Sequence, residues 1–256
     1  MQIHTIMQKI KDITSYLESI SPLAYQEDYD NAGLITGDAN DEIIGVLISL
    51  DCTEEVVDES IAKKCNLIIA HHPIVFKGLK RFTGKNYVER TIIKAIKNDI
   101  AIYAIHTNLD NVIEGVSGMI AKKLSLINPA ILSPKLDLLS KLEFFVPKSD
   151  ADKVKNAIHK AGAGNIGNYS NCSFTTTGIG SFLPNENATP QIGTIDNQEN
   201  VVEERIEVIL PSYLEKKIIA VLKDNHPYEE VAYYISRLQN MNQEVGSGII
   251  ADLKSP

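Results

Sequence analysis

The chain has 256 residues, of which 44% are hydrophobic and 23% charged, the composition of a globular protein with one large domain or two smaller ones. Its 25 Lys and Arg residues against 33 Asp and Glu residues give a formal charge of −8. This charge disfavours a generic binder of nucleic acids or acidic membranes, because such proteins need a positive surface. The three cysteines are widely spaced, which excludes a disulfide framework and a CxxC metal site.

The N-terminal segment mixes Lys, Asp and Glu into its apolar pattern, so it lacks the apolar core of a signal peptide. The longest apolar runs, such as residues 67–70, are far too short to cross a bilayer. These features predict a cytoplasmic protein with no membrane partner.

Strands and helices are expected to alternate through the first half of the chain. Apolar residues at spacings of three and four predict a first helix over 5–20, which the following Ser-Pro pair ends. The next expected elements are strands at 34–36 and 43–50, a helix at 53–64 capped from 51–53, a strand at 67–70, a helix at 87–98, a strand at 100–105 and a helix at 116–126. This alternation predicts an α/β fold with a mostly parallel sheet and flanking helices.

A second unit is expected after residues 127–142, which contain two prolines and are interpreted as a connection. The pattern then predicts strands at 142–146 and 172–178 around a helix at 150–161, a polar loop at 180–200, and strands at 203–210 and 231–238 around a helix at 213–224. This β-α-β-β-α-β order is typical of an α+β ferredoxin-like domain.

Two glycine-rich segments resemble nucleotide-binding motifs in their residues but not in the spacing or structural context that those motifs require. Residues 162–167 fit GxGxxG, but they follow a predicted helix and precede a strand, the reverse of the dinucleotide motif. Residues 78–85 are one residue too long for a P-loop, and Asn86 stands where a Mg²⁺-binding Ser or Thr is required. Both segments are interpreted as structural.

The strongest candidate site lies where two buried strands end. His71 and His72 follow the strand at 67–70, and His106 and Asp110 follow the strand at 100–105. Asp110 lies 110 − 72 = 38 residues after His72, about one strand–helix–strand repeat, so the two strand ends are expected to be neighbours. Imidazole and carboxylate groups are ordinary ligands of Zn²⁺, Mn²⁺ and Fe²⁺, and an adjacent His pair suits a centre with two ions.

Alternatives remain open at these positions. His71 and His72 alone could equally be polar residues at a strand end, satisfied by backbone and water. His106 could be a ligand, a residue that orients a ligand, or a proton shuttle.

Lys77 begins a local positive cluster that also contains Lys80 and Arg81, which is consistent with an anionic substrate. Solvated surface charge explains this cluster at least as well. Asp30 and Asn31, with Gly33, could supply further polar groups, but they need no function as a turn that enters a strand.

The segment HPYEE at 226–230 offers a histidine and two carboxylates that could share one face of a helix. Pro227 and the strand-like residues that follow favour a turn between a helix and a strand. His4 and His159 lie among polar residues of predicted helical segments, and no role is assigned to them.

The motifs resemble those of the NGG-one-interacting-factor-three-like family, also called the GTP cyclohydrolase I type 2 homologues. The matching stretches are YDNAGLITGD at 29–38, IAHHPIVFKGL at 69–79, IAIYAIHTNLD at 100–110, DNHPYEEVAYYI at 224–235, and the segment at 162–193 that contains FLPNENATPQIG. They occur in the family's order along nearly the whole chain.

The resemblance implies a dinuclear metal centre in an α/β protein that assembles as a toroidal homo-hexamer. Its ions would be two divalent transition metals (Zn, Mn or Fe), with His71, His72 and Asp110 as ligands and His106 beside them. From the residues themselves, we interpret His106 as the catalytic residue and Lys77 as a contact of the substrate. Residues 1–138 would form the N-terminal half of the metal-binding domain, 139–239 an inserted domain similar to PII or CutA that includes HPYEE, and 240–256 the start of a C-terminal half.

The chain departs from the family pattern at its C-terminal end. In the family a second α/β half ends in a Gly-His…Glu motif that supplies the remaining ligands, whereas this chain ends in GSGIIADLKSP with no histidine after His226. We therefore expect weak metal binding at an incomplete site. An uncovered sheet edge or apolar face is expected to cause poor solubility or self-association.

Two functions are compatible with these features. The first is a metal-dependent hydrolase that acts on a small anionic, nucleotide-like substrate, with His106 relaying a proton. GTP chemistry is implied by the resemblance alone, because no guanine-specific motif is visible. The second is a non-catalytic metal-binding scaffold or regulatory protein, in which the inserted domain mediates assembly or senses a ligand.

Overall fold

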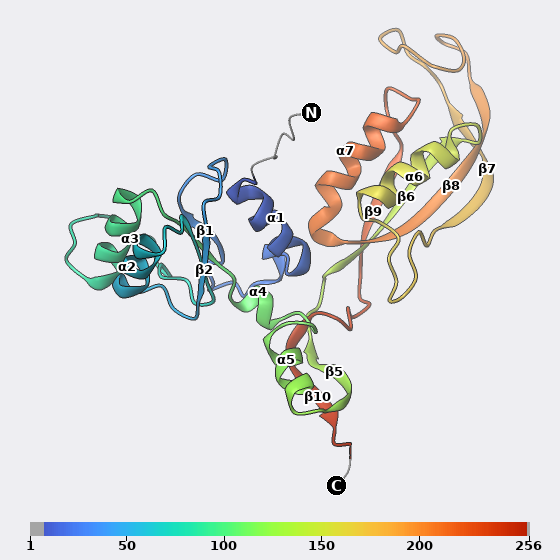
Figure 1. The fold of residues 1–256 in the computed structure, drawn as a ribbon. Coiled ribbons are helices and arrows are strands. Elements are labelled where there is room, and N and C mark those ends of the chain that lie inside the picture. Colours follow the sequence, from blue (N-terminus) through green and yellow to red (C-terminus); the bar gives the residue numbers. More distant parts are fainter. Residues whose placement is uncertain (1–7, 255–256) are drawn as a thin grey trace, which may run out of the picture. The chain divides into compact units, whose positions relative to one another are not determined.

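The computed structural model describes residues 8–254, which divide into two compact units (Figure 1). The first unit combines the chain up to Pro134 with the residues from Gln243 onward, and the second is Lys135–Asn242. The expected helix at 5–20 begins outside the described residues. Within them, helix α1 spans Ile10–Ile20, followed by a 3₁₀ turn at Leu23–Tyr25.

The first unit is built on a four-stranded sheet with the order β1-β4-β3-β2. Strands β2, β3 and β4 run parallel, and β1 is antiparallel to β4. The strands are β1 (Gly33–Thr36), β2 (Val46–Ser49), β3 (Leu67–Ala70) and β4 (Ala101–Ala104). The mixed α/β fold predicted from the sequence is confirmed.

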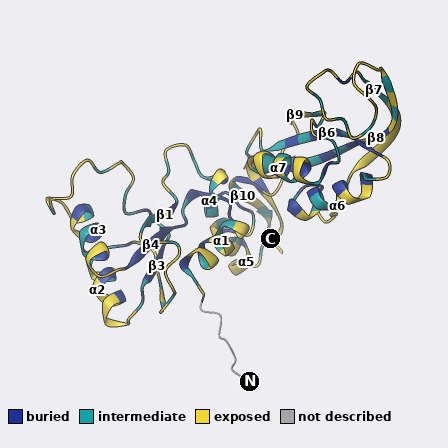
Figure 2. Cartoon of the chain, turned by 90° about the horizontal axis from the view of Figure 1, so that it is seen from above, coloured by how far each residue is buried: buried dark blue, intermediate teal, exposed yellow. Residues whose placement is uncertain are grey.

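Apolar side chains cover both faces of this sheet. Ile68 and Ala70 of β3 pack with helices α2 (Glu54–Ala62) and α3 (Tyr87–Lys97). Leu67 and Ile69 point to the other face, where they pack with α1. Alternate residues of a strand point to opposite faces, so β3 is buried throughout, as its unbroken apolar run predicted. Figure 2 shows the resulting buried strands and exposed outer helix faces.

The expected connection at 127–142 is wrong, because most of it forms strands. Strand β5 (Ile127–Pro134) pairs antiparallel with β10 (Gly246–Asp252), which comes from the far end of the chain, and residues 139–142 already belong to β6. Two short helices precede this pair, α4 (Thr107–Asp110) and α5 (Val116–Lys123), and the sequence analysis did not predict α4. Local prolines suggested a loop, but pairing with a distant strand determined the structure.

The second unit has one antiparallel sheet with the order β7-β8-β6-β9. Its elements are β6 (Leu139–Pro147), α6 (Ala151–Ala161), β7 (Phe174–Phe182), β8 (Glu199–Pro211), a 3₁₀ turn at Ser212–Leu214, α7 (Glu215–Asn225) and β9 (Tyr233–Leu238). Both helices contribute to a core with alternate strand residues such as Phe144 and Ile206. Gly162 ends α6 in the left-handed conformation, with φ 119°, so this GxGxxG segment begins at a helix C-terminus.

Among residues 8–254, no helix combines the length and the apolar character needed to cross a membrane.

Candidate metal centre

The candidate centre lies at the carboxyl ends of β3 and β4. The backbone N–H groups of His71 and His72 donate to the carbonyls of Ser49 (3.2 Å) and Leu50 (2.9 Å), which extends the pairing of β3 with β2 beyond Ala70. Pro73 then ends the pairing because it has no N–H. The parallel arrangement thereby brings both histidines to the sheet edge where β4 also ends.

Three imidazole rings meet at this edge. The ring centroids of His71 and His72 are 4.9 Å apart, and the ring of His106 lies 5.2 Å from the first and 5.4 Å from the second. One ring nitrogen from each residue lies within 4.8 Å of the others. The three-histidine cluster, defined as His71, His72 and His106, could therefore hold a metal ion.

Each ring of the cluster is oriented by a hydrogen bond at its Nδ1 atom. The acceptor is the Ile105 carbonyl for His71, an Asp51 carboxylate oxygen for His72 and an Asp30 carboxylate oxygen for His106, each at 2.8 Å. Carbonyl and carboxylate oxygens accept only, so Nδ1 carries the proton in each neutral ring. The Nε2 lone pairs are left available for a cation, as in histidines that ligate metals.

Asp30 is the buried support of the cluster, since its side chain has no exposed surface. Its second carboxylate oxygen accepts the backbone N–H of Thr107 at 3.0 Å and also the Thr107 hydroxyl. Burial by itself raises the pKa of Asp30, but hydrogen bonds from Thr107, His106 and Asn31 outweigh it and lower the pKa overall. A carboxylate charge is therefore held against His106.

Asp110 lies at the end of α4, beside the cluster and outside the three-histidine group. Its Oδ1 is 3.7 Å from Nε2 of His71, which is too long for a hydrogen bond. Two ligands of one tetrahedral ion, each bound at about 2.1 Å, would be separated by about 3.4 Å. The position of Asp110 is therefore compatible with an ion shared with His71.

Asp51 is a residue of the site that the sequence analysis missed. It follows β2 at the same edge where His71 follows β3, and this position after a parallel strand was the available signal. The local sequence indicates only a place in a helix cap for this residue. The cap itself is Thr53, which accepts the N–H of Val56.

The loop after His72 contacts the site through Val75 and Phe76, and one of its partners is Asn31, which the sequence offered as a further polar group. The amide of Asn31 donates to the carbonyl of Val75 at 2.6 Å, and the ring of Phe76 lies 5.7 Å from that of His106. Lys77 is exposed and forms no ion pair in the described part of the chain, as is also true of Lys80 and Arg81.

The remaining histidines belong elsewhere. His226 is a buried residue of the second unit whose Nε2 donates to the Phe145 carbonyl at 2.8 Å and whose Nδ1 accepts the N–H of Tyr228 at 3.1 Å. Burial lowers its pKa. His159 lies on α6, and His4 lies outside the described residues.

Comparison with known proteins assigns the family. Residues 8–256 match the family model Duf34/NIF3 (NGG1p interacting factor 3). The chain is 42% identical over 246 residues to a Bacillus subtilis protein named GTP cyclohydrolase 1 type 2 homolog, covering 96% of this chain and 66% of that protein. A protein of the same name from Staphylococcus aureus is 37% identical over 245 residues, with 96% and 66% covered.

Solved structures agree with this result. The crystal structure of a Bacillus cereus protein related to NIF3 has a TM-score of 0.83 and 41% identity, covering 98% of this chain and 67% of that one. A Staphylococcus aureus protein gives a TM-score of 0.68 and 32% identity, covering 97% and 65%. The chain thus spans about two thirds of the length of these relatives, and it belongs to the Duf34/NIF3 family.

Proposed function

We propose that this chain carries part of a dinuclear metal centre and acts in a metal-dependent hydrolase. His71, His72 and Asp110 would be the protein ligands, and Zn²⁺, Mn²⁺ or Fe²⁺ the ions that suit these nitrogen and oxygen donors. The observation that carries the proposal is the orientation of three imidazoles by acceptors at Nδ1, which leaves three Nε2 atoms available at one sheet edge.

Different residues of the chain would transfer protons and orient the metal ligands at this centre. When bound, a divalent ion supplies a Lewis acid and a water of lowered pKa. His106 would accept and pass on a proton at Nε2, because the buried Asp30 carboxylate binds its Nδ1 and fixes the orientation of the ring. Asp51 and the Ile105 carbonyl would keep the ligand rings in position.

The substrate class we propose is a small anionic, nucleotide-like molecule. Support comes from the basic side chains Lys77, Lys80 and Arg81, which follow the histidine pair in an otherwise acidic chain. The relatives' name refers to GTP cyclohydrolase, and a nucleotide is consistent with that name.

We further propose that the second unit is an inserted ferredoxin-like domain of the PII or CutA type. Its strand order, β7-β8-β6-β9, and its two helices in one core support this assignment. The strands that flank it in sequence, β5 and β10, pair with each other in the first unit, as expected when a domain is inserted between them. We also propose that the protein assembles as a toroidal hexamer in the cytoplasm.

Metal analysis after loading with Zn²⁺ or Mn²⁺ and dialysis tests this function. We expect bound metal in the wild-type chain, its loss in the His71→Ala/His72→Ala variant, and its retention in the control His159→Ala. The His106→Ala variant should lose hydrolysis of nucleoside triphosphates by the loaded protein. Equal metal content in wild type and in the double variant would contradict the centre. Metal binding without hydrolysis would leave the metal-binding scaffold as the function.

A further inference from the structure

The second unit contains a cavity of about 450 Å³ that the proposed metal chemistry does not use. It lies on the sheet face opposite the helices. Phe144 of β6 and Ile206 of β8 point into the core with α6 and α7. Phe145 and Glu203 lie one and three positions away on the same strands, hence on the opposite face, and line the cavity with Tyr234 of β9. Its volume is within the range of small-molecule sites.

Two sequence motifs without an assigned role form the cavity's cover. One is the loop after β7, and the other is the HPYEE turn at 226–230. The backbone N–H of Thr189 in the loop donates to the Glu229 carboxylate in the turn at 2.7 Å, which joins the two segments. The cover is thus a connected structure that closes over the sheet.

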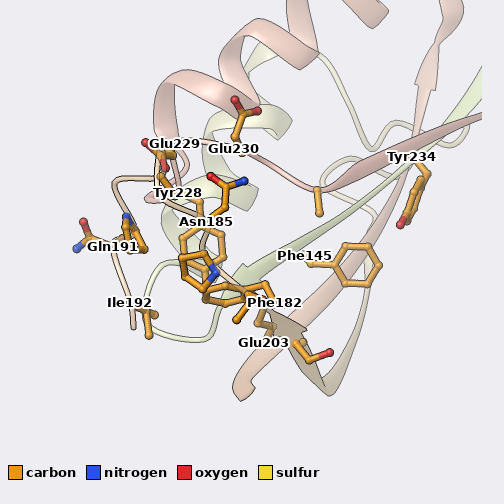
Figure 3. A pocket seen from close by; sticks show the side chains of 17 residues that line it. Phe145, Phe182, Asn185, Gln191, Ile192, Glu203, Tyr228, Glu229, Glu230 and Tyr234 are labelled. Carbon is orange, nitrogen blue, oxygen red and sulfur yellow. The ribbon is translucent and has the colours of Figure 1, made fainter. Parts of the chain in front are cut away.

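Aromatic rings form much of the wall (Figure 3). The rings of Phe182 and Tyr228 have centroids 6.1 Å apart, and those of Phe145 and Tyr234 are 5.9 Å apart. Aromatic faces attract both apolar groups and organic cations.

Glu203 is the unusual polar residue of this cavity, because it is only 8% exposed. Other carboxylates on the same sheet face are ion-paired, since Glu143 and Glu207 each contact Lys141 and Arg205. Glu203 forms no ion pair with Lys or Arg among the described residues, and its polar neighbours are the Tyr228 hydroxyl and the buried His226 ring. The carboxylate fits beside β7 because position 180 is glycine, where a Cβ atom would collide with it.

The charge of the cavity selects one class of ligand. Its walls contain three carboxylates, those of Glu203, Glu229 and Glu230, and none of the described residues that line it is Lys, Arg or His. A nearly buried carboxylate without a cation is unfavourable, and a cationic ligand would relieve this. Phosphates would be repelled by the same three groups.

We propose that this cavity binds a small organic cation whose ammonium group contacts Glu203 and whose apolar or aromatic part lies against Phe182 and Tyr228. Glu203 determines the preference for positive charge, and the rings bind the apolar part of the ligand. The site is independent of the metal centre, because all its residues belong to the second unit.

Three indole probes of similar size, whose side chains end in groups of different charge, test this site. They are tryptamine (cationic), tryptophol (neutral) and indole-3-acetate (anionic). The chain contains no Trp, so the anisotropy of probe fluorescence reports binding when the indole is excited at the red edge of its absorption, where the tyrosines do not absorb. We expect tryptamine to bind about tenfold or more tightly than tryptophol and indole-3-acetate to bind most weakly. Equal affinities, tighter binding of the anion, or no binding of tryptamine would overturn the proposal.

Two variants and a matched control assign the preference to Glu203. Glu203→Gln should reduce the tryptamine preference to near unity, whereas Glu207→Gln, on the same strand and face but already paired with Lys141 and Arg205, should retain it. Glu230→Gln, at an exposed position of the wall, should lower tryptamine affinity by a smaller factor and keeps the test valid if the Glu203 variant fails to fold. Unchanged preference in a folded Glu203→Gln protein, or in Glu230→Gln if the other does not fold, would refute the assignment.

Discussion

His72 in the first unit and His226 in the second show two different uses of one side chain. His72 uses Nδ1 to bind Asp51 and leaves Nε2 without a partner among residues 8–254, in a side chain that is 43% exposed. His226 is 8% exposed and uses both nitrogens, donating to Phe145 and accepting from Tyr228. A histidine is available to a metal only when its protein contacts leave one lone pair accessible. The histidine contacts therefore separate the candidate metal centre from structural positions.

The largest expected effect comes from removing the buried support of the centre. Asp30→Ala would leave the Thr107 N–H and hydroxyl and the His106 Nδ1–H without their acceptor, and should lower the free energy of unfolding by about 3–5 kcal/mol. Urea denaturation measures this change. Asp38→Ala, which removes an exposed carboxylate that accepts hydrogen bonds from Asn40, is the control and should cost far less. Similar losses in both variants would show that Asp30 is not a special support.

A smaller loss of stability is expected at the structural histidine. His226→Ala removes a buried ring and leaves the Phe145 carbonyl without its donor, which should destabilise the protein by about 2–3 kcal/mol. Because both ring nitrogens serve the fold, metal content should stay at the wild-type level. Urea denaturation and metal analysis of the same preparation measure the loss of stability and the metal content. Loss of metal in a folded His226→Ala protein would contradict the distinction between the two histidines.

Changing the acceptor of His72 should affect metal binding rather than folding. Asp51→Asn replaces an exposed carboxylate by a neutral amide, and residues that orient a ligand in this way typically affect metal affinity by about 10–100-fold. Asp58→Asn, at a similarly exposed position paired with Lys94, is the matched control. Titration with Zn²⁺ measures both affinities, and equal values would remove Asp51 from the site.

The smallest effect is a pH dependence from His226. Burial lowers the pKa of this group in the folded state below its value of 6.5 in the unfolded chain, so the unfolded state takes up the proton first as pH falls. Stability from this residue is present above about pH 6.5 and decreases as pH falls toward the folded pKa. Denaturation at a series of pH values should give a flatter profile for His226→Gln. A residual slope is expected from His159, whose pKa is lowered by burial and by Lys155.

Much of the first unit followed from local patterns. Leu67–Ala70 is a strand as predicted, since four apolar residues before two histidines and a proline can be buried on both faces. Parallel strands end at one edge, so the meeting of His71 and His72 with His106 was also predictable. The cap at Thr53 follows from the hydrogen-bonding capacity of its hydroxyl.

Features that depend on contacts between distant segments were not predictable in this way. Strand β5 exists because β10 pairs with it, and no local pattern in 127–134 specifies that partner. Asp30 became the support of His106 through a contact across 76 residues. The cavity at Glu203 needs the loop after β7 and the HPYEE turn to meet.

The amino-acid sequence by itself determined most of the helices and strands, the family and the sheet edge that gathers the histidines. Periodicity, capping and strand-end chemistry are local properties that neighbouring residues encode directly. Only the tertiary structure decided which ring nitrogens remain available, where a carboxylate is buried without a cation and which strand completes β5. These outcomes depend on hydrogen bonds and packing between segments far apart in the chain, whose partners are established only when the whole chain is folded.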